Sequence, residues 1–238
     1  MDQTLGLRHL LEAGVHFGHR SRRWNPRMKP YIFGKRQGIY VIDLEKTLER
    51  LRIACQVARE IAETGKDLLF VGTKQQAKPI IKEEAERCGS WYVTERWVGG
   101  LLTNFEQVSK QIARLSDLER MRVDGRLGAM SKKDQARFER EYAKLAKLFG
   151  GVKDMDRLPG AIFVIDAVKE KTPIAEARRM RIPVIALIDT NGNPELVDYP
   201  IPGNDDAMRS IKLFAGQIAL AVMEGKKGFE SEKPQSRR

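Results

Sequence analysis

Three runs of consecutive apolar residues, each long enough for one β-strand, constrain the fold of this chain more than any other feature. They occupy residues 68–71, 161–165 and 183–188. An uninterrupted apolar run of this length is typical of a strand that is buried on both faces of a parallel sheet. Segments with helical periodicity separate the runs, and this alternation predicts an α/β fold. Right-handed crossovers then give a flavodoxin- or Rossmann-like doubly wound, mostly parallel sheet.

Weaker signals complete the predicted body. Shorter strands are expected at residues 38–43, 91–93 and 197–202. The last of these belongs at a sheet edge because it contains two prolines. Helices are expected at residues 5–12, 44–63, 75–88, 172–180 and 205–224. Asp43 is positioned to cap the helix that begins at residue 44, and Gly65 is positioned to end it.

The segment between residues 103 and 150 breaks the alternation because it contains no strand signal. Apolar residues recur every three or four positions from Phe105 to Leu118 and again from Phe138 to Phe149, as in helices with narrow apolar seams. A glycine-containing turn at residues 123–126 joins the two predicted helices. We therefore expect an inserted antiparallel coiled-coil hairpin that projects from the body. The alternative is a helical subdomain that packs flat against the sheet.

These signals divide the chain into four parts. Residues 1–102 form the first part of the α/β body and carry a basic arm. Residues 103–150 form the inserted hairpin, and residues 151–224 complete the body. Residues 225–238 are short of apolar side chains and are expected to form a disordered tail.

The arm, residues 10–36, mixes cations with aromatic side chains and contains one acidic residue, Glu12. The whole chain has a formal net charge of +11 and a pI of about 9.7, and residues 1–36 hold eight Lys and Arg against two Asp and Glu. Such a stretch suits a surface that neutralises phosphates and stacks on bases. Its glycines and two X-Pro steps favour an ordered contact arm over the alternative, a solvated basic loop.

Cysteine usage and the N-terminal sequence indicate the compartment. Cys55 and Cys88 lie within helical patterns and form no CxxC pair, so reduced thiols of a cytosolic protein are expected. The N-terminal residues contain no apolar signal region, and no apolar run approaches the length of a membrane span. We therefore expect a cytoplasmic protein without a membrane partner.

Fingerprints of nucleotide-dependent enzymes are weak in this sequence. No GxGxxG motif follows a predicted strand. The sequence Val71-Gly72-Thr73-Lys74 lies at a strand-to-helix junction, where backbone N–H groups and a lysine can meet an anion. It does not match the GxxxxGK[ST] pattern, however, because the upstream glycine is missing and the lysine follows the threonine.

Carboxylates gather at the predicted carboxyl edge of the sheet. Asp166 and Asp189 end two strands, and Asp205 opens the last helix. If the arm folds over this edge, His16, Asp189 and Asp205 can hold one structural zinc or magnesium ion. In the alternative, Asp189 and Asp205 cap turns and hydrogen-bond to His16. No cofactor is otherwise required.

Six segments together resemble one known family. They are LLEAGVHFGHRSRRWNPRMKPYIFG, FVGTKQQAK, RWVGGLLTN, LPGAIFVIDA, IPVIALIDTN and IPGNDDAMRSI, in this order and over most of the chain. They resemble the S-two family of bacterial small-subunit ribosomal proteins. The resemblance implies a flavodoxin-like domain with an inserted hairpin and a non-enzymatic, structural role in the small ribosomal subunit. It also implies contacts with 16S ribosomal RNA and a part in docking the mRNA-binding ribosomal protein one.

The expected RNA contacts combine the arm, the first strand-to-helix junction and the root of the hairpin. They are Arg20, Arg22, Arg23, Trp24, Arg27, Lys29, Arg36, Lys74, Arg96, Asn104 and Lys110. The expected mechanism is phosphate neutralisation and shape fit rather than base readout. One alternative is a metal- or nucleotide-dependent phosphotransfer or hydrolytic enzyme that uses Asp166, Asp189 and Asp205. Another is a free coiled-coil adaptor, which has no need of so basic an arm.

Overall fold

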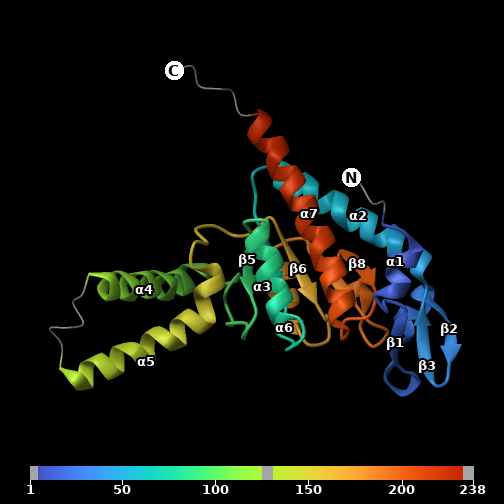
Figure 1. Ribbon diagram of the computed structural model, residues 1–238, viewed down its shortest axis with the longest axis horizontal. Helices are drawn as coiled ribbons and strands as arrows, with labels where there is room; N and C mark the ends of the chain where they lie inside the picture. Colours follow the sequence, from blue (N-terminus) through green and yellow to red (C-terminus); the bar gives the residue numbers. More distant parts are fainter. Residues whose placement is uncertain (1–4, 125–130, 233–238) are drawn as a thin grey trace.

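A five-stranded parallel sheet forms the centre of the computed structural model, which describes residues 5–124 and 131–232. Its strands are β4 (Leu68–Val71), β5 (Trp91–Val93), β6 (Ala161–Ile165), β7 (Val184–Ile188) and β8 (Tyr199–Pro202). Their spatial order is β5-β4-β6-β7-β8, and every neighbouring pair is parallel. Numbered along the chain, this is the order 2-1-3-4-5 of flavodoxin-like sheets. The predicted fold class is therefore confirmed (Figure 1).

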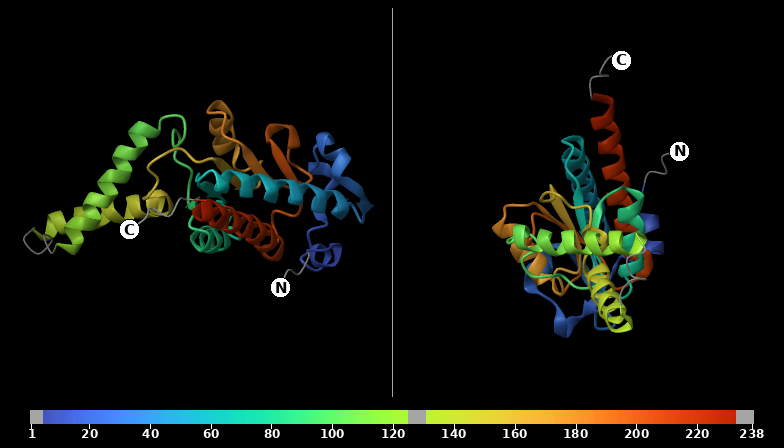
Figure 2. Two further views of the ribbon diagram at one scale, coloured as in Figure 1. Left: turned by 90° about the horizontal axis from the view of Figure 1, so that it is seen from above. Right: turned by 90° about the vertical axis from the view of Figure 1, so that its left-hand side faces the viewer.

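Helices cover both faces of this sheet because each strand is apolar on both sides. On one face α2 (Leu44–Glu63), α3 (Lys78–Arg87) and α7 (Met208–Glu232) pack over Phe70 and Phe163, whose rings meet edge to face at 5.4 Å. On the other face α6 (Lys171–Arg179) packs with the loop that leads to the hairpin. Figure 2 shows α2 and α7 on one side and α6 on the other.

The N-terminal arm forms a second, smaller sheet, which the sequence did not predict. Its strands are β1 (Phe17–Arg20), β2 (Ile32–Arg36) and β3 (Ile39–Ile42), in the order β1-β3-β2 and all antiparallel. The expected strand at residues 38–43 exists as β3, but it pairs within the arm and not with the central sheet. Its partners were missed because their basic and aromatic residues give no apolar alternation. The short helix α1 (Leu7–Glu12) precedes this sheet, as predicted.

The inserted segment forms two helices, α4 (Phe105–Val123) and α5 (Lys132–Phe149). They project from the body rather than lying flat against the sheet (Figures 1 and 2). Buried Ile112, Leu115 and Phe138 form the seam, and Arg114 pairs with Glu141 across it, with 2.9 Å between Nε and Oε1. The predicted turn lies largely outside the described residues. Coiled-coil packing of the seam stays a prediction.

The last helix is longer than the sequence predicted. The expected disordered tail began at residue 225, whereas α7 continues to Glu232. Two contacts with the body explain the difference. Lys226 Nζ lies 2.7 Å from Asp67 Oδ1, and the Phe229 ring packs so closely on Gly65 that an added Cβ there would lie 2.6 Å from it. The prediction is therefore wrong for residues 225–232, and the rest of the tail lies outside the described residues.

Among the helices of residues 5–124 and 131–232, none combines the length and the apolar character that a membrane crossing requires.

Candidate nucleic-acid interface

The basic arm is an ordered element that is fastened to the carboxyl edge of the central sheet. The backbone N–H of Asn25 donates to Thr190 O at 2.8 Å, and the N–H of His19 donates to Thr190 Oγ1 at 2.8 Å. Met28 is fully buried in the hydrophobic core on the α6 face of the sheet. The choice between an ordered arm and a solvated loop is therefore settled in favour of order.

The arm presents its cations to solvent. Those expected to contact RNA are all exposed: Arg20, Arg22, Arg23, Arg27, Lys29 and Arg36. Arg27 forms an exposed ion pair with Glu195, with 3.1 Å between Nε and Oε2. Within the part of the chain that the structure describes, the other five have no ion pair. Trp24 is half-buried, and its ring lies 4.9 Å from the Tyr40 ring, so only part of its surface is open to a base.

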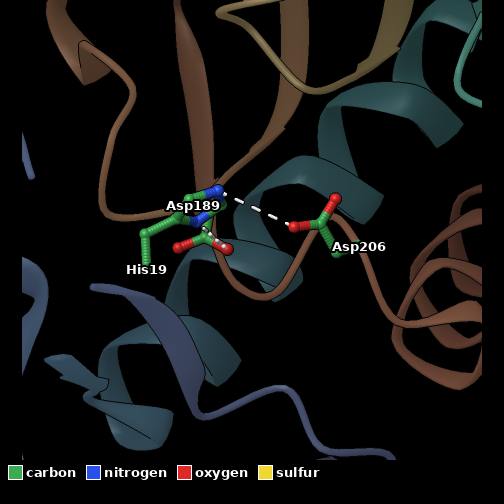
Figure 3. A group of neighbouring side chains, drawn as sticks. All are labelled: His19, Asp189 and Asp206. Atoms are coloured by element: carbon green, nitrogen blue, oxygen red, sulfur yellow. Dashed lines mark ion pairs between the residues drawn. The ribbon is translucent and has the colours of Figure 1, made fainter. Parts of the chain in front are cut away.

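His19, rather than His16, meets the carboxylates of the sheet edge (Figure 3). His19 Nδ1 lies 2.9 Å from Asp189 Oδ2, and Nε2 lies 3.7 Å from Asp206 Oδ2. Asp189 follows β7 and is buried, whereas Asp206 precedes α7 and is exposed. The hydrogen bond with Asp189 raises the pKa of His19, although partial burial opposes it. One donor atom from each of the three side chains lies within 4.8 Å of the others.

His16 lies apart from this group. Its ring stacks on Phe17 at 3.9 Å, and it lines a cavity of about 460 Å³ with apolar residues of α1 and the small sheet, among them Leu7, Leu11 and Phe33. Burial lowers the pKa of His16. The predicted set of His16, Asp189 and Asp205 is therefore not brought together. The sequence places two imidazoles three residues apart, and only the path of β1 decides which one faces Asp189.

Lys74 forms ion pairs with three carboxylates of the sheet edge. Its Nζ lies 2.6 Å from Asp205 Oδ1, 2.7 Å from Asp166 Oδ2 and 2.9 Å from Asp206 Oδ1. Burial lowers the pKa of this ammonium, but the three carboxylates outweigh it and raise the pKa. Burial and the charges of Asp166 and Asp189 raise the pKa of Asp205, with Lys74 opposing. The prediction that Lys74 contacts RNA does not fit this geometry, because its side chain is 12% exposed and already surrounded.

The root of the hairpin is built around a buried carboxylate that the sequence analysis missed. Glu176 on α6 accepts hydrogen bonds from Trp97 Nε1 at 2.9 Å and from the backbone N–H groups of Gly100, Leu102 and Thr103 at 2.8, 3.0 and 3.2 Å. Burial raises the pKa of Glu176, but these donors outweigh it and lower the pKa. The available signal in the sequence was a single acidic residue in an otherwise basic helical segment.

The hairpin-root residues expected to contact RNA lie on the surface, as the sequence predicted for an interface. Arg96, Asn104 and Lys110 are all exposed. Lys110 forms a loose ion pair with Glu106, with 3.6 Å between Nζ and Oε1. Asn104 is the N-cap residue of α4 but makes no side-chain capping bond. The hairpin and the arm extend from opposite sides of the body (Figure 1), so the predicted contacts form two separate surfaces.

Fold and site together define an α/β protein whose sheet-edge carboxylates are engaged within the fold, while an arm and a projecting helix pair present exposed cations. The family model for ribosomal protein S2 matches residues 10–225. The chain belongs to the ribosomal protein S2 family.

Curated relatives agree with this assignment. Small ribosomal subunit protein uS2 of Endomicrobium trichonymphae is 56% identical over 223 residues, which are 94% of this chain and 91% of the relative. Small ribosomal subunit protein uS2 of Treponema pallidum, in the Nichols strain and in a second strain, is 55% identical over 218 residues, which are 92% of this chain and 75% of each relative. The chain therefore has a structural ribosomal role and is not an enzyme. The alternative of a phosphotransfer or hydrolytic enzyme is wrong.

Proposed function

We propose that this protein binds 16S rRNA in the small ribosomal subunit of the cytoplasm, through the phosphate-facing cations of its ordered arm. The observation that carries the proposal is that five of the six predicted arm cations, all of them exposed, have no ion pair among the described residues. An anchored backbone reduces the entropy lost on binding. Exposed guanidinium groups suit phosphate oxygens because they offer several donors in a fixed plane.

Replacing two arm cations together tests this proposal. In the Arg22→Gln/Arg23→Gln variant, binding to purified 16S rRNA should weaken, and the slope of log affinity against log salt should flatten by roughly 0.7 to 0.9 per lost phosphate contact. Filter binding over a salt series measures both quantities. The control is Arg52→Gln/Lys227→Gln, which removes the same charge from exposed positions on α2 and α7. Equal salt slopes for the two variants would show that the arm does not contact the RNA.

The family resemblance also supports a partner protein. We propose that the bound protein helps to dock the mRNA-binding ribosomal protein one on the small subunit. Sedimentation of lysate through sucrose gradients tests both roles together. The protein is expected to sediment with the small subunit at moderate salt and to dissociate from it at high salt. Subunits that lack this protein should carry less ribosomal protein one. Migration as a free protein at every salt concentration would contradict the ribosomal placement.

A structural metal ion at the sheet edge is a separate proposal. The donor set of His19, Asp189 and Asp206 supplies one imidazole and two carboxylates from three different elements. Zinc fits this set better than magnesium, because magnesium prefers oxygen ligands alone. Asp205 does not belong to this group of donors. Asp206 also pairs with Lys74 through Oδ1, but its second oxygen, Oδ2, faces His19. The metal would tie the arm to the sheet and needs no catalytic role.

Metal analysis of two histidine variants tests this proposal. Purified full-length protein is expected to contain about one zinc per chain, measured by mass spectrometry after desalting. The His19→Gln variant should lose the zinc, since it removes the imidazole donor. The His16→Gln variant should retain it, because His16 lies in a separate apolar cavity. Zinc-free wild-type protein, or equal metal content in both variants, would contradict the site.

A further inference from the structure

The segment 169–181, which contains α6, exposes positive charges only. It holds two acidic residues, Glu170 and Glu176, and both are buried, with exposed fractions of 3% and 8%. Glu170 accepts hydrogen bonds from the backbone N–H and the hydroxyl of Thr73, and Glu176 holds the hairpin root. Its five cations, in contrast, all reach solvent: Lys169, Lys171, Arg178, Arg179 and Arg181. The surface charge is therefore higher than the composition of the segment indicates.

The cations border an exposed strip along α6. Lys171 and Arg178 are seven residues apart, which places them on the same side of α6, about 10 Å from one another along its axis. The exposed positions between them, Thr172 and Ala175, carry small side chains. A polyanion can therefore approach the helix closely between two groups of cations.

These cations have few competing partners within the protein. Lys169 Nζ donates to Thr73 O at 3.2 Å. The other four form no ion pair with any residue of 5–124 or 131–232. Asp198 shares a cavity of about 350 Å³ with Arg178 and Arg181, but its carboxylate accepts a hydrogen bond from the N–H of Val184 at 2.9 Å. Their charge is thus largely available to an external anion.

The opposite face of the body differs in this respect. There two ion pairs join neighbouring helices: Arg59 with Glu224 and Lys212 with Glu83. The α6 face also continues into the surfaces proposed above. Met28 of the arm and Trp97 of the hairpin root belong to the same hydrophobic cluster as Ile174 of α6. The part of the arm around Met28, α6 and the hairpin root therefore lie on one side of the sheet.

We propose that α6 is an additional RNA-binding surface, on which Lys171, Arg178, Arg179 and Arg181 neutralise backbone phosphates of the same 16S rRNA. This inference rests on the proposed function, because it assigns a further surface to that interaction. The choice of RNA over an acidic protein follows from the charge. Four cations without an ion pair among the described residues surround a strip whose middle carries only Thr172 and Ala175, and the exposed apolar side chain of the segment, Met180, lies beyond the end of α6. Protein interfaces, in contrast, are centred on buried aromatic or aliphatic side chains.

Filter binding with purified 16S rRNA provides the first test. The Arg178→Gln/Arg179→Gln variant should flatten the salt slope by about 1.4 to 1.8 relative to wild type, as expected for two lost phosphate contacts. The Arg52→Gln/Lys227→Gln variant is again the control for equal charge loss, and thermal unfolding checks that all variants fold. If the arm variant flattens the slope but the α6 variant matches the control, the α6 inference fails while the proposed function stands. If wild-type protein does not bind, both fail.

A crosslink from the middle of the strip provides the second test. An Ala175→Cys variant can be labelled with a thiol-directed photocrosslinker, because burial raises the pKa of Cys55 to about 12 and also raises that of Cys88, which leaves both native thiols poorly reactive. In reconstituted small subunits this position is expected to crosslink to 16S rRNA. The matched Glu49→Cys variant, at an exposed position on α2, should not crosslink to the RNA. Crosslinking of position 175 to a protein, or to nothing, would overturn the inference.

Discussion

At the scale of single residues, buried and half-buried carboxylates of this protein accept hydrogen bonds from its own backbone. Glu176 gathers three backbone N–H groups and the Trp97 indole at the root of the hairpin. Asp43 caps α2 by accepting from the N–H groups of Glu45 and Lys46. Such acceptors satisfy donors that a loop or a helix end would otherwise leave unpaired. The charge of these residues is therefore used inside the fold, and the surface becomes more positive.

Replacing Glu176 should show the strength of this arrangement. Glu176→Gln retains the size of the side chain but leaves one acceptor oxygen, and its amide faces N–H donors. We expect a loss of about 2 to 4 kcal/mol of unfolding free energy at pH 7, because hydrogen bonds to a charged acceptor are strong and unpaired buried donors are costly. Urea unfolding measures it. Glu49→Gln, at an exposed position, should change stability by less than about 0.5 kcal/mol.

The effect of Glu176→Gln on stability should depend on pH. The pKa of Glu176 is lowered in the folded protein, so its stabilising contribution is fully present above its unfolded pKa of about 4.5. The contribution is lost as the pH falls through the lower folded value. The difference in stability between wild type and Glu176→Gln should therefore shrink below pH 4.5. A difference that is equally large well below that pH would contradict the assigned role of the carboxylate charge.

At the scale of elements, the sequence predicts what depends on local periodicity and misses what depends on distant contacts. The buried strands and α2 with its Asp43 cap follow from patterns within a few residues. The arm sheet does not. β1 pairs with β3 across the intervening basic segment and is bonded to Thr190, far away in the chain. β2 is a neighbour of β3 in the chain, but its residues show no apolar alternation. The end of α7 likewise depends on Asp67 and Gly65.

The sheet-edge cluster shows the same division. The sequence correctly places Asp166 and Asp189 at the carboxyl ends of parallel strands, where side chains converge. It does not reveal that Lys74 reaches Asp205 across the sheet, nor that His19 rather than His16 turns towards Asp189. Both choices depend on side-chain directions that only the assembled arm and sheet define.

At the scale of the whole molecule, the protein separates two kinds of surface. The α2, α3 and α7 face pairs many of its cations within the fold. The arm, α6 and the hairpin root leave most of theirs exposed, and they are spread along the body from the arm to the base of the hairpin (Figures 1 and 2). An elongated row of cations suits a folded RNA better than a small ligand, because distant segments of one RNA can be contacted together.

Contacts in the arm and at the hairpin root should contribute independently to RNA binding. We expect Arg22→Gln/Arg23→Gln in the arm and Arg96→Gln/Lys110→Gln at the hairpin root each to weaken binding to 16S rRNA. Combined, their effects should add to within about 0.5 kcal/mol, because the two sites share no side-chain partner. Filter binding of all four proteins at one salt concentration completes the cycle. A coupling energy above about 1 kcal/mol would show instead that the arm and the hairpin act as a single site.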